Sequence, residues 1–81
     1  MVRKQLTVKG DVLRSQKARD FVDITSGFKS SVYLEVGNKR VNAKSIIGVL
    51  SMNLSDGDSV LLLVDGEDEE TAIMAVEEYM C

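Results

Sequence analysis

Two short segments of alternating apolar and polar residues indicate a sheet with one buried face. Residues 2–8 and 31–36 alternate in this way. Because successive side chains of a strand point to opposite faces, each segment predicts a strand that packs on a core through one face. After the second segment, Gly37-Asn38 favours a tight hairpin that returns as a short strand over residues 39–42. Residues 59–64 are β-branched and leucine-rich, which is typical of a strand enclosed by its neighbours.

Three further segments have the spacing of helices. The first is expected to have Ser15 as its N-cap and to end at Gly27, with apolar positions at Ala18, Phe21, Val22 and Thr25. A short second helix follows Ser45. An acidic loop over residues 65–70 precedes the third helix, whose inward residues are expected to be Ala72, Ile73, Val76 and Met80, with Glu77 and Glu78 outward.

The order of these elements is strand, helix, strand, strand, helix, strand, helix. It predicts an α+β open-faced sandwich, in which a four-stranded antiparallel sheet carries helices on one face. The 81 residues contain no linker, internal repeat or low-complexity segment, so one domain is expected over residues 1–81.

The composition excludes several kinds of site. The sequence has no histidine, and its only cysteine is Cys81, so we expect no metal, no cofactor and no internal disulfide. The terminal thiol is expected to be incidental, although dimerisation or modification is the alternative. The apolar run 60–64 is too short to span a bilayer and nothing resembles a signal peptide, so a cytoplasmic protein without a membrane partner is expected.

Charge is distributed unevenly along the chain. Residues 1–44 hold all ten Lys and Arg residues and carry a net charge of +6, whereas residues 45–81 carry −9. A compact fold can bring the two halves together so that they neutralise each other; the alternative is a basic face that steers acidic partners. The net charge of −3, with two Phe and two Tyr for stacking, argues against direct nucleic-acid binding.

Residues 41–51, Val-Asn-Ala-Lys-Ser-Ile-Ile-Gly-Val-Leu-Ser, resemble the bacterial phosphocarrier family HPr. In that family a Lys-Ser-Ile triplet opens the short second helix; here the triplet is Lys44-Ser45-Ile46. The preceding hairpin and the loop 66–69 support the resemblance, which extends over nearly the whole chain and is strongest over residues 32–52. It implies the element order βαββαβα and the open-faced sandwich of that family.

The resemblance fails at the family's phosphorylation site, a histidine followed by alanine, arginine and proline at the start of the first helix. Counted back without gaps from the triplet, these four positions fall on Arg14, Ser15, Gln16 and Lys17. A neutral imidazole nitrogen attacks a phosphoryl group and releases it again, whereas the guanidinium of Arg14 has no lone pair to offer. A phosphate ester on Ser15 is a poor onward donor. We therefore predict that phosphate relay is lost. The cluster of Arg14, Lys17 and Arg19 is either a solvated basic patch or an anion-docking site.

Ser45 is the residue that retains a candidate role. Serine is a preferred N-cap. The residues around Ser45 do not show whether it has a role beyond capping. The resemblance implies that Ser45 is also the target of a regulatory kinase. A helix N-terminus would stabilise the added negative charge, so phosphorylation need not unfold the domain.

The short helix after Ser45 is richer in apolar residues than one buried face requires. These residues either fill the core or form a patch for partner proteins; they are Ile46, Ile47, Leu50 and Met52. Because neighbours on a helix differ by about 100°, Ile46 and Ile47 cannot both point inward. The resemblance implies a partner-binding patch in which Ile47 and Leu50 match exposed positions.

Three functions are consistent with these residues. The first is a non-enzymatic regulatory or docking protein related to the sugar phosphotransferase system, similar to the catabolite-repression homologues of HPr, which also lack the histidine and keep the serine. Its partners would be an HPr kinase-like enzyme, a transcriptional regulator or a phosphotransferase component. The second is a phosphotransferase component with a non-histidine acceptor. The third is an unrelated small scaffold domain.

Overall fold

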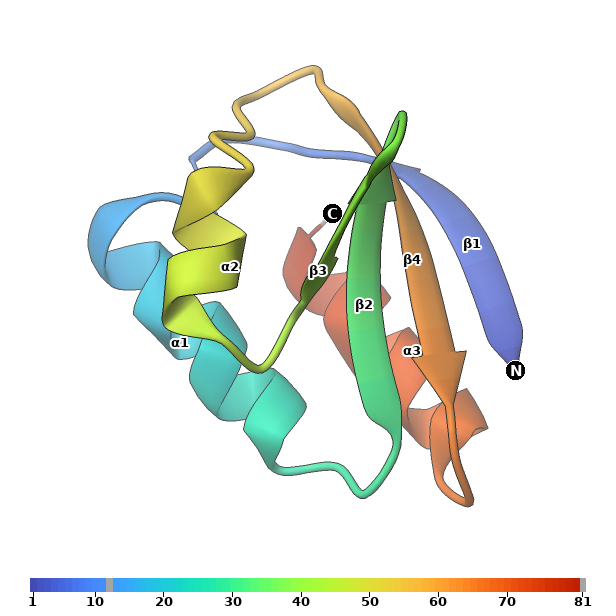
Figure 1. The fold of residues 1–81 in the computed structure, drawn as a ribbon. Helices are drawn as coiled ribbons and strands as arrows, with labels where there is room; N and C mark the ends of the chain where they lie inside the picture. The colour runs from blue at the N-terminus through green and yellow to red at the C-terminus, as the bar shows by residue number, and fades with distance from the viewer. Residues whose placement is uncertain (12, 81) are drawn as a thin grey trace.

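The computed structural model describes residues 1–11 and 13–80, without the side chain of Ser15. Four strands and three helices follow in the predicted order (Figure 1). They are β1 (Val2–Thr7), α1 (Ser15–Ser26), β2 (Ser31–Val36), β3 (Lys39–Asn42), α2 (Ile46–Ser51), β4 (Ser59–Asp65) and α3 (Glu69–Met80). The α+β architecture predicted from the periodicities is confirmed. The expectation for Cys81 lies outside the described residues.

The four strands form one antiparallel sheet in the order β1-β4-β2-β3. The register places Leu34 beside Leu62, and Leu62 beside Lys4. On this face Leu34 and Leu62 are fully buried and belong to the hydrophobic core. Figure 1 shows the three helices on this side of the sheet, leaving the other side open.

The core lies between the sheet and the helices. The sheet supplies alternate residues of β2 and β4, and the helices supply Ala18 and Phe21 from α1, Val49 from α2, and Val76 and Met80 from α3. All of these are fully buried. Apolar burial on one face of each element accounts for why this short chain folds as a two-layer structure.

Leu63 is buried on the open face, although it lies outside the main core. Its register partners are Arg3 on β1 and Tyr33 on β2, so it lies in the row between these two side chains. Arg40 lies over the ring of Tyr33, with its guanidinium carbon 5.7 Å from the ring centroid. This matches the prediction that β4 is enclosed by its neighbours and explains why both faces of the strand are apolar.

Three sequence-based details were wrong. Helix α1 begins at Ser15, so the N-cap is Arg14, which makes no side-chain capping bond because a guanidinium cannot accept a hydrogen bond. Helix α3 begins at Glu69, inside the segment predicted as a loop. Glu77, which was expected to point to solvent, is half-buried and forms an ion pair with Lys4 at 2.6 Å.

The loop between β4 and α3 is attached to the start of β2 through one carboxylate. Asp68 accepts hydrogen bonds from the backbone N–H groups of Lys29 and Ser30, both at 2.8 Å, and from the hydroxyl of Ser30. Gly66 approaches Ser30 so closely that a Cβ on Gly66 would lie 2.5 Å from the Ser30 Cα. Only glycine fits here, since the φ of Gly66 is +156° as well.

Candidate functional site

The four positions that the resemblance aligns with the family's phosphorylation site, residues 14–17, lie at the start of α1. Arg14, Gln16 and Lys17 are exposed and, with Asp11, line a shallow depression. The backbone carbonyl of Lys17 accepts a hydrogen bond from the Tyr79 hydroxyl at 2.7 Å, which joins α1 to α3. Ser15 is the first helical residue. The described side chains around this depression are two cations, an amide and a carboxylate, and none of them is an imidazole.

Ser45 is the N-cap of α2, as predicted. Its backbone is extended (φ −108°, ψ 118°), and its Oγ accepts a hydrogen bond from the backbone N–H of Gly48 at 3.3 Å. The residue is half-buried. The capping bond uses Oγ as an acceptor, so the hydroxyl hydrogen is not needed for it.

The loop that carries Ser45 is held by backbone hydrogen bonds on both sides. Asn42 accepts from Ser45 through its carbonyl at 3.0 Å and from the N–H of Lys44 through its side chain at 2.9 Å. The N–H of Ala43 donates to the carbonyl of Val32 on β2 at 2.8 Å. These bonds fix the loop to the sheet and set where α2 begins.

Helix α2 divides the four predicted patch residues into two pairs. Ile47 is 79% exposed and Leu50 is 46% exposed, whereas Ile46 and Met52 are half-buried and pack against the core. The prediction that Ile46 and Ile47 point in different directions is confirmed. Ile46 and Met52 are less exposed because the side of α2 that buries Val49 also draws them against the core, and partner binding by the four residues stays a prediction.

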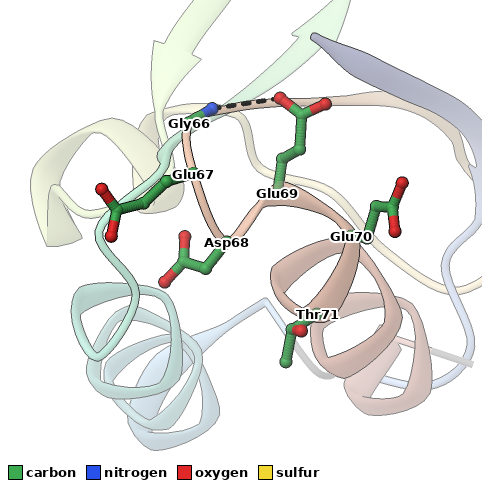
Figure 2. Close-up of a pocket in the computed structure, with 6 residues that line it drawn as sticks. All are labelled: Gly66, Glu67, Asp68, Glu69, Glu70 and Thr71. Atoms are coloured by element: carbon green, nitrogen blue, oxygen red, sulfur yellow. Dashed lines mark hydrogen bonds between the residues drawn. The ribbon is translucent and has the colours of Figure 1, made fainter.

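The acidic segment before and within the first turn of α3 lines a second hollow (Figure 2). Figure 2 shows its four carboxylates pointing in different directions rather than toward one point. That of Glu69 accepts from the backbone N–H of Gly66 at 3.2 Å, and that of Asp68 is held by Ser30 and Lys29. The hydrogen bond from the Ser30 hydroxyl, followed by that from the Lys29 N–H, lowers the pKa of Asp68 to about 2. The Asp68 and Glu69 carboxylates therefore stabilise the loop itself.

Sequence reasoning did not single out the two side chains that attach the Ser45 loop to α1. They are Thr25 and Lys44, which bond to backbone carbonyls distant in sequence. By its spacing Thr25 is an apolar position of α1, and Lys44 stands in the sequence only as part of the Lys-Ser-Ile triplet. Nothing in the local sequence indicates which carbonyl a threonine or lysine will reach.

Among residues 1–11 and 13–80 there is no group of three or more His, Cys, Asp or Glu residues that could hold a metal ion. In the same part of the chain, no helix is long and apolar enough to cross a membrane.

Comparison with known proteins decides the family. Residues 2–81 match the family model described as the PTS HPr component phosphorylation site. The chain belongs to the HPr family. Relatives include the HPr-like protein Crh of Bacillus subtilis, 38% identical over 81 residues that cover 99% of this chain and 95% of that protein. The phosphocarrier protein HPr of Xylella fastidiosa strain Temecula1 is 37% identical over 79 residues, which cover 96% and 89% of the two chains.

Solved structures of HPr and Crh share the fold. A crystal structure of HPr-C-His from Thermoanaerobacter tengcongensis superposes with a TM-score of 0.93 at 38% identity, covering 99% of this chain and 91% of that one. A crystal structure of Bacillus subtilis Crh, described as an intertwined dimer with a swapped domain, gives a TM-score of 0.79 at 38% identity and covers 99% and 88%. The match to HPr and Crh makes this chain an HPr-like protein related to the phosphotransferase system.

Proposed function

We propose that this HPr-family chain is a regulatory docking protein that does not relay phosphate. In this proposal it binds protein partners through the surface formed by Ile47 and Leu50, and phosphorylation of Ser45 controls that binding. The observation that carries the proposal is the position of Ser45. It caps the same six-residue helix that exposes both apolar side chains, in a chain without histidine.

The side chains at the start of α1 support the proposed loss of relay. A phosphocarrier needs a group that is nucleophilic near neutral pH and whose phosphoryl adduct stays reactive. The guanidinium of Arg14 and the ammonium of Lys17 are protonated at that pH, and the Gln16 amide is not nucleophilic. These residues favour binding over group transfer.

The geometry of Ser45 supports its modification within the folded domain. Esterification replaces the hydroxyl hydrogen but keeps Oγ, so the Gly48 N–H can still donate to it. The added phosphate would carry a charge of about −1.5 to −2 beside the patch of Ile47 and Leu50. A charge of that size changes which partner surface can bind, by repelling acids or by recruiting arginine.

The patch is suited to a protein partner. Ile47 is the most exposed of the large apolar side chains in the described residues. Exposed apolar side chains of this kind form the buried centre of an interface when a partner covers them. We propose as partners an HPr kinase-like enzyme and either a transcriptional regulator or a phosphotransferase component.

The test is incubation of the intact chain with a bacterial HPr kinase and ATP, followed by intact-mass measurement and site mapping. One phosphoryl group is expected on wild type, none on Ser45→Ala and one on Ser51→Ala. Ser51→Ala is the matched control. Ser51 lies at the other end of α2 from Ser45, and its hydroxyl donates to the Gly48 carbonyl at 2.7 Å. Modification of Ser45→Ala to the same extent as wild type would contradict the proposal.

A further inference from the structure

Two side-chain hydrogen bonds attach the Ser45 loop to the C-terminal end of α1. The Thr25 hydroxyl donates to the carbonyl of Ala43 at 2.8 Å, the shorter of its two contacts; the other is to the Val22 carbonyl within α1, at 3.0 Å. The Lys44 ammonium donates to the carbonyl of Phe28 at 2.8 Å. Thr25 is fully buried and Lys44 is half-buried. The two bonds join segments 16 to 18 residues apart in opposite directions: one is donated from α1, and the other is donated to Phe28, in the turn that follows α1.

The backbone hydrogen bonds hold the Ser45 loop on the sheet side, and the two side-chain hydrogen bonds hold it on the α1 side. The N–H groups of residues 43–45 bond to Val32 and Asn42, on the sheet side of the loop. Thr25 satisfies the Ala43 carbonyl and Lys44 satisfies the Phe28 carbonyl, both on the α1 side. A buried carbonyl without a partner is unfavourable, so each bond restricts where the loop can lie. Ser45 is thereby held between the sheet and α1.

The direction of Lys44 determines its role. A lysine next to a phosphorylated serine suggests direct neutralisation of the phosphate charge. Here its ammonium is committed to the Phe28 carbonyl, while the Ser45 Oγ bonds to Gly48. The Lys44 ammonium therefore acts on the position of the loop, through its hydrogen bond to a backbone carbonyl. The uncharged Thr25 hydroxyl makes the same kind of bond to the loop nearby.

We propose that Thr25 and Lys44 are positioning residues for the phosphorylation of Ser45. This inference rests on the proposed function. Together they hold the Ser45 hydroxyl where a kinase can align it with the phosphoryl group of ATP. Because alignment of the reacting atoms, and not docking, would be impaired without them, their loss lowers kcat and leaves KM largely unchanged.

The experiment compares four variants of the full chain in steady-state phosphorylation by a bacterial HPr kinase. Thr25→Val and Lys44→Gln are expected to lower kcat by about fivefold to a hundredfold, the range for a lost hydrogen bond or a misplaced reacting group. Thr25→Ser keeps the donating hydroxyl and is expected to restore most of the rate. Lys39→Gln is the matched control: the Lys39 ammonium also donates to a backbone carbonyl, that of Ser51 at 2.9 Å, but at the other end of α2.

Amide hydrogen exchange provides a readout that needs no kinase. In Thr25→Val and Lys44→Gln the amides of Ser45 and Gly48 are expected to exchange faster than in wild type, while amides of β2 and β4 stay protected. Faster exchange across the whole sheet would mean general destabilisation and would contradict a positioning role. All rates are measured at a temperature at which every variant is folded.

The outcomes separate this inference from the function on which it rests. If wild type is not phosphorylated at Ser45, the proposed function fails and the inference fails with it. If wild type is phosphorylated and Thr25→Val reacts as fast, the inference alone fails. If Lys39→Gln and Lys44→Gln are slowed equally while Thr25→Val is not, charge and not position is responsible, and the inference is again wrong.

Discussion

At the scale of single residues, the Asp68 carboxylate accepts three hydrogen bonds and joins two loops. Its two carboxylate oxygens accept three hydrogen bonds from Lys29 and Ser30. Such bonds favour the charged form, which is why the pKa of Asp68 falls from 3.8 to about 2. The carboxylate thus joins the loop that begins α3 to the strand that lies at the centre of the sheet.

We expect Asp68 to make the stability of the protein pH-dependent. Because its pKa is lower in the folded than in the unfolded chain, its contribution is present above about pH 4. That contribution is lost as the pH falls from about 4 through 2. Asp68→Asn should therefore melt below wild type at pH 7, and the difference in Tm should shrink at pH 2. Thermal melts at both values check this.

The control for that prediction is Glu67→Gln. Glu67 is the neighbouring acid and pairs with the Lys29 ammonium at 3.1 Å, but its side chain is 73% exposed. Exposed pairs of this kind contribute about 0–1 kcal/mol. A Tm of Asp68→Asn that stays below wild type by the same amount at pH 7 and pH 2 would show that the carboxylate charge is not involved.

At the scale of elements, the short helix α2 combines packing with exposure. Its inner side buries Val49 and draws Ile46 and Met52 against the core, and its outer side leaves Ile47 and Leu50 in solvent. A helix whose outer apolar residues contribute nothing to the core can lose them without unfolding. This makes binding and stability separable by mutation.

Replacing Ile47 by Asp is expected to weaken binding without weakening the fold. An exposed residue at the centre of an interface contributes about 1–2 kcal/mol or more, so KM for a bacterial HPr kinase should rise about tenfold. The free energy of unfolding should change by less than about 0.5 kcal/mol, as is usual at exposed sites.

Met74→Asp is the matched control, because Met74 is 68% exposed but lies on α3. Its KM should equal that of wild type. Equal KM values for the Ile47 and Met74 variants would show that α2 is not the docking surface.

The elements themselves could be predicted because each follows from a local pattern. Alternation in residues 31–36 and the Gly37-Asn38 turn define a hairpin whatever the rest of the chain does. The contacts around the Ser45 loop are different in kind. The bonds from Thr25 to Ala43 and from Lys44 to Phe28 depend on how α1 lies against the β3–α2 loop, and that is settled by the whole core.

At the scale of the whole molecule, the fold brings together the oppositely charged halves of the chain. Lys4 pairs with Glu77, and Lys29 pairs with Glu67, each joining a base of the first half to an acid of the second. These contacts support mutual neutralisation over much of the surface. Arg14 and Lys17 form no ion pair within the described residues, so the exposed start of α1 keeps its positive charge.

Restoring the histidine alone is expected not to restore phosphate relay. Arg14→His supplies an imidazole at the cap of α1, but the family's arginine and proline positions remain Gln16 and Lys17. The phosphate would lack its guanidinium partner, and such charge-assisted bonds are among the strongest available. Transfer from phosphoenolpyruvate through the family's upstream enzyme, followed by radiolabel, should stay far below that of an HPr with an intact site. Near-normal transfer by this single variant would show that the surrounding residues matter little.

We propose above that this HPr-family chain is phosphorylated on a regulated serine and does not carry phosphate on a histidine. The most direct measurement is the intact mass of the wild-type chain after exposure to two donors in parallel: phosphoenolpyruvate with the upstream phosphotransferase enzyme, and ATP with an HPr kinase. The account predicts no adduct from the first and a single acid-stable phosphoryl group, mapped to Ser45, from the second. An adduct from phosphoenolpyruvate that can be passed to a second protein would contradict it.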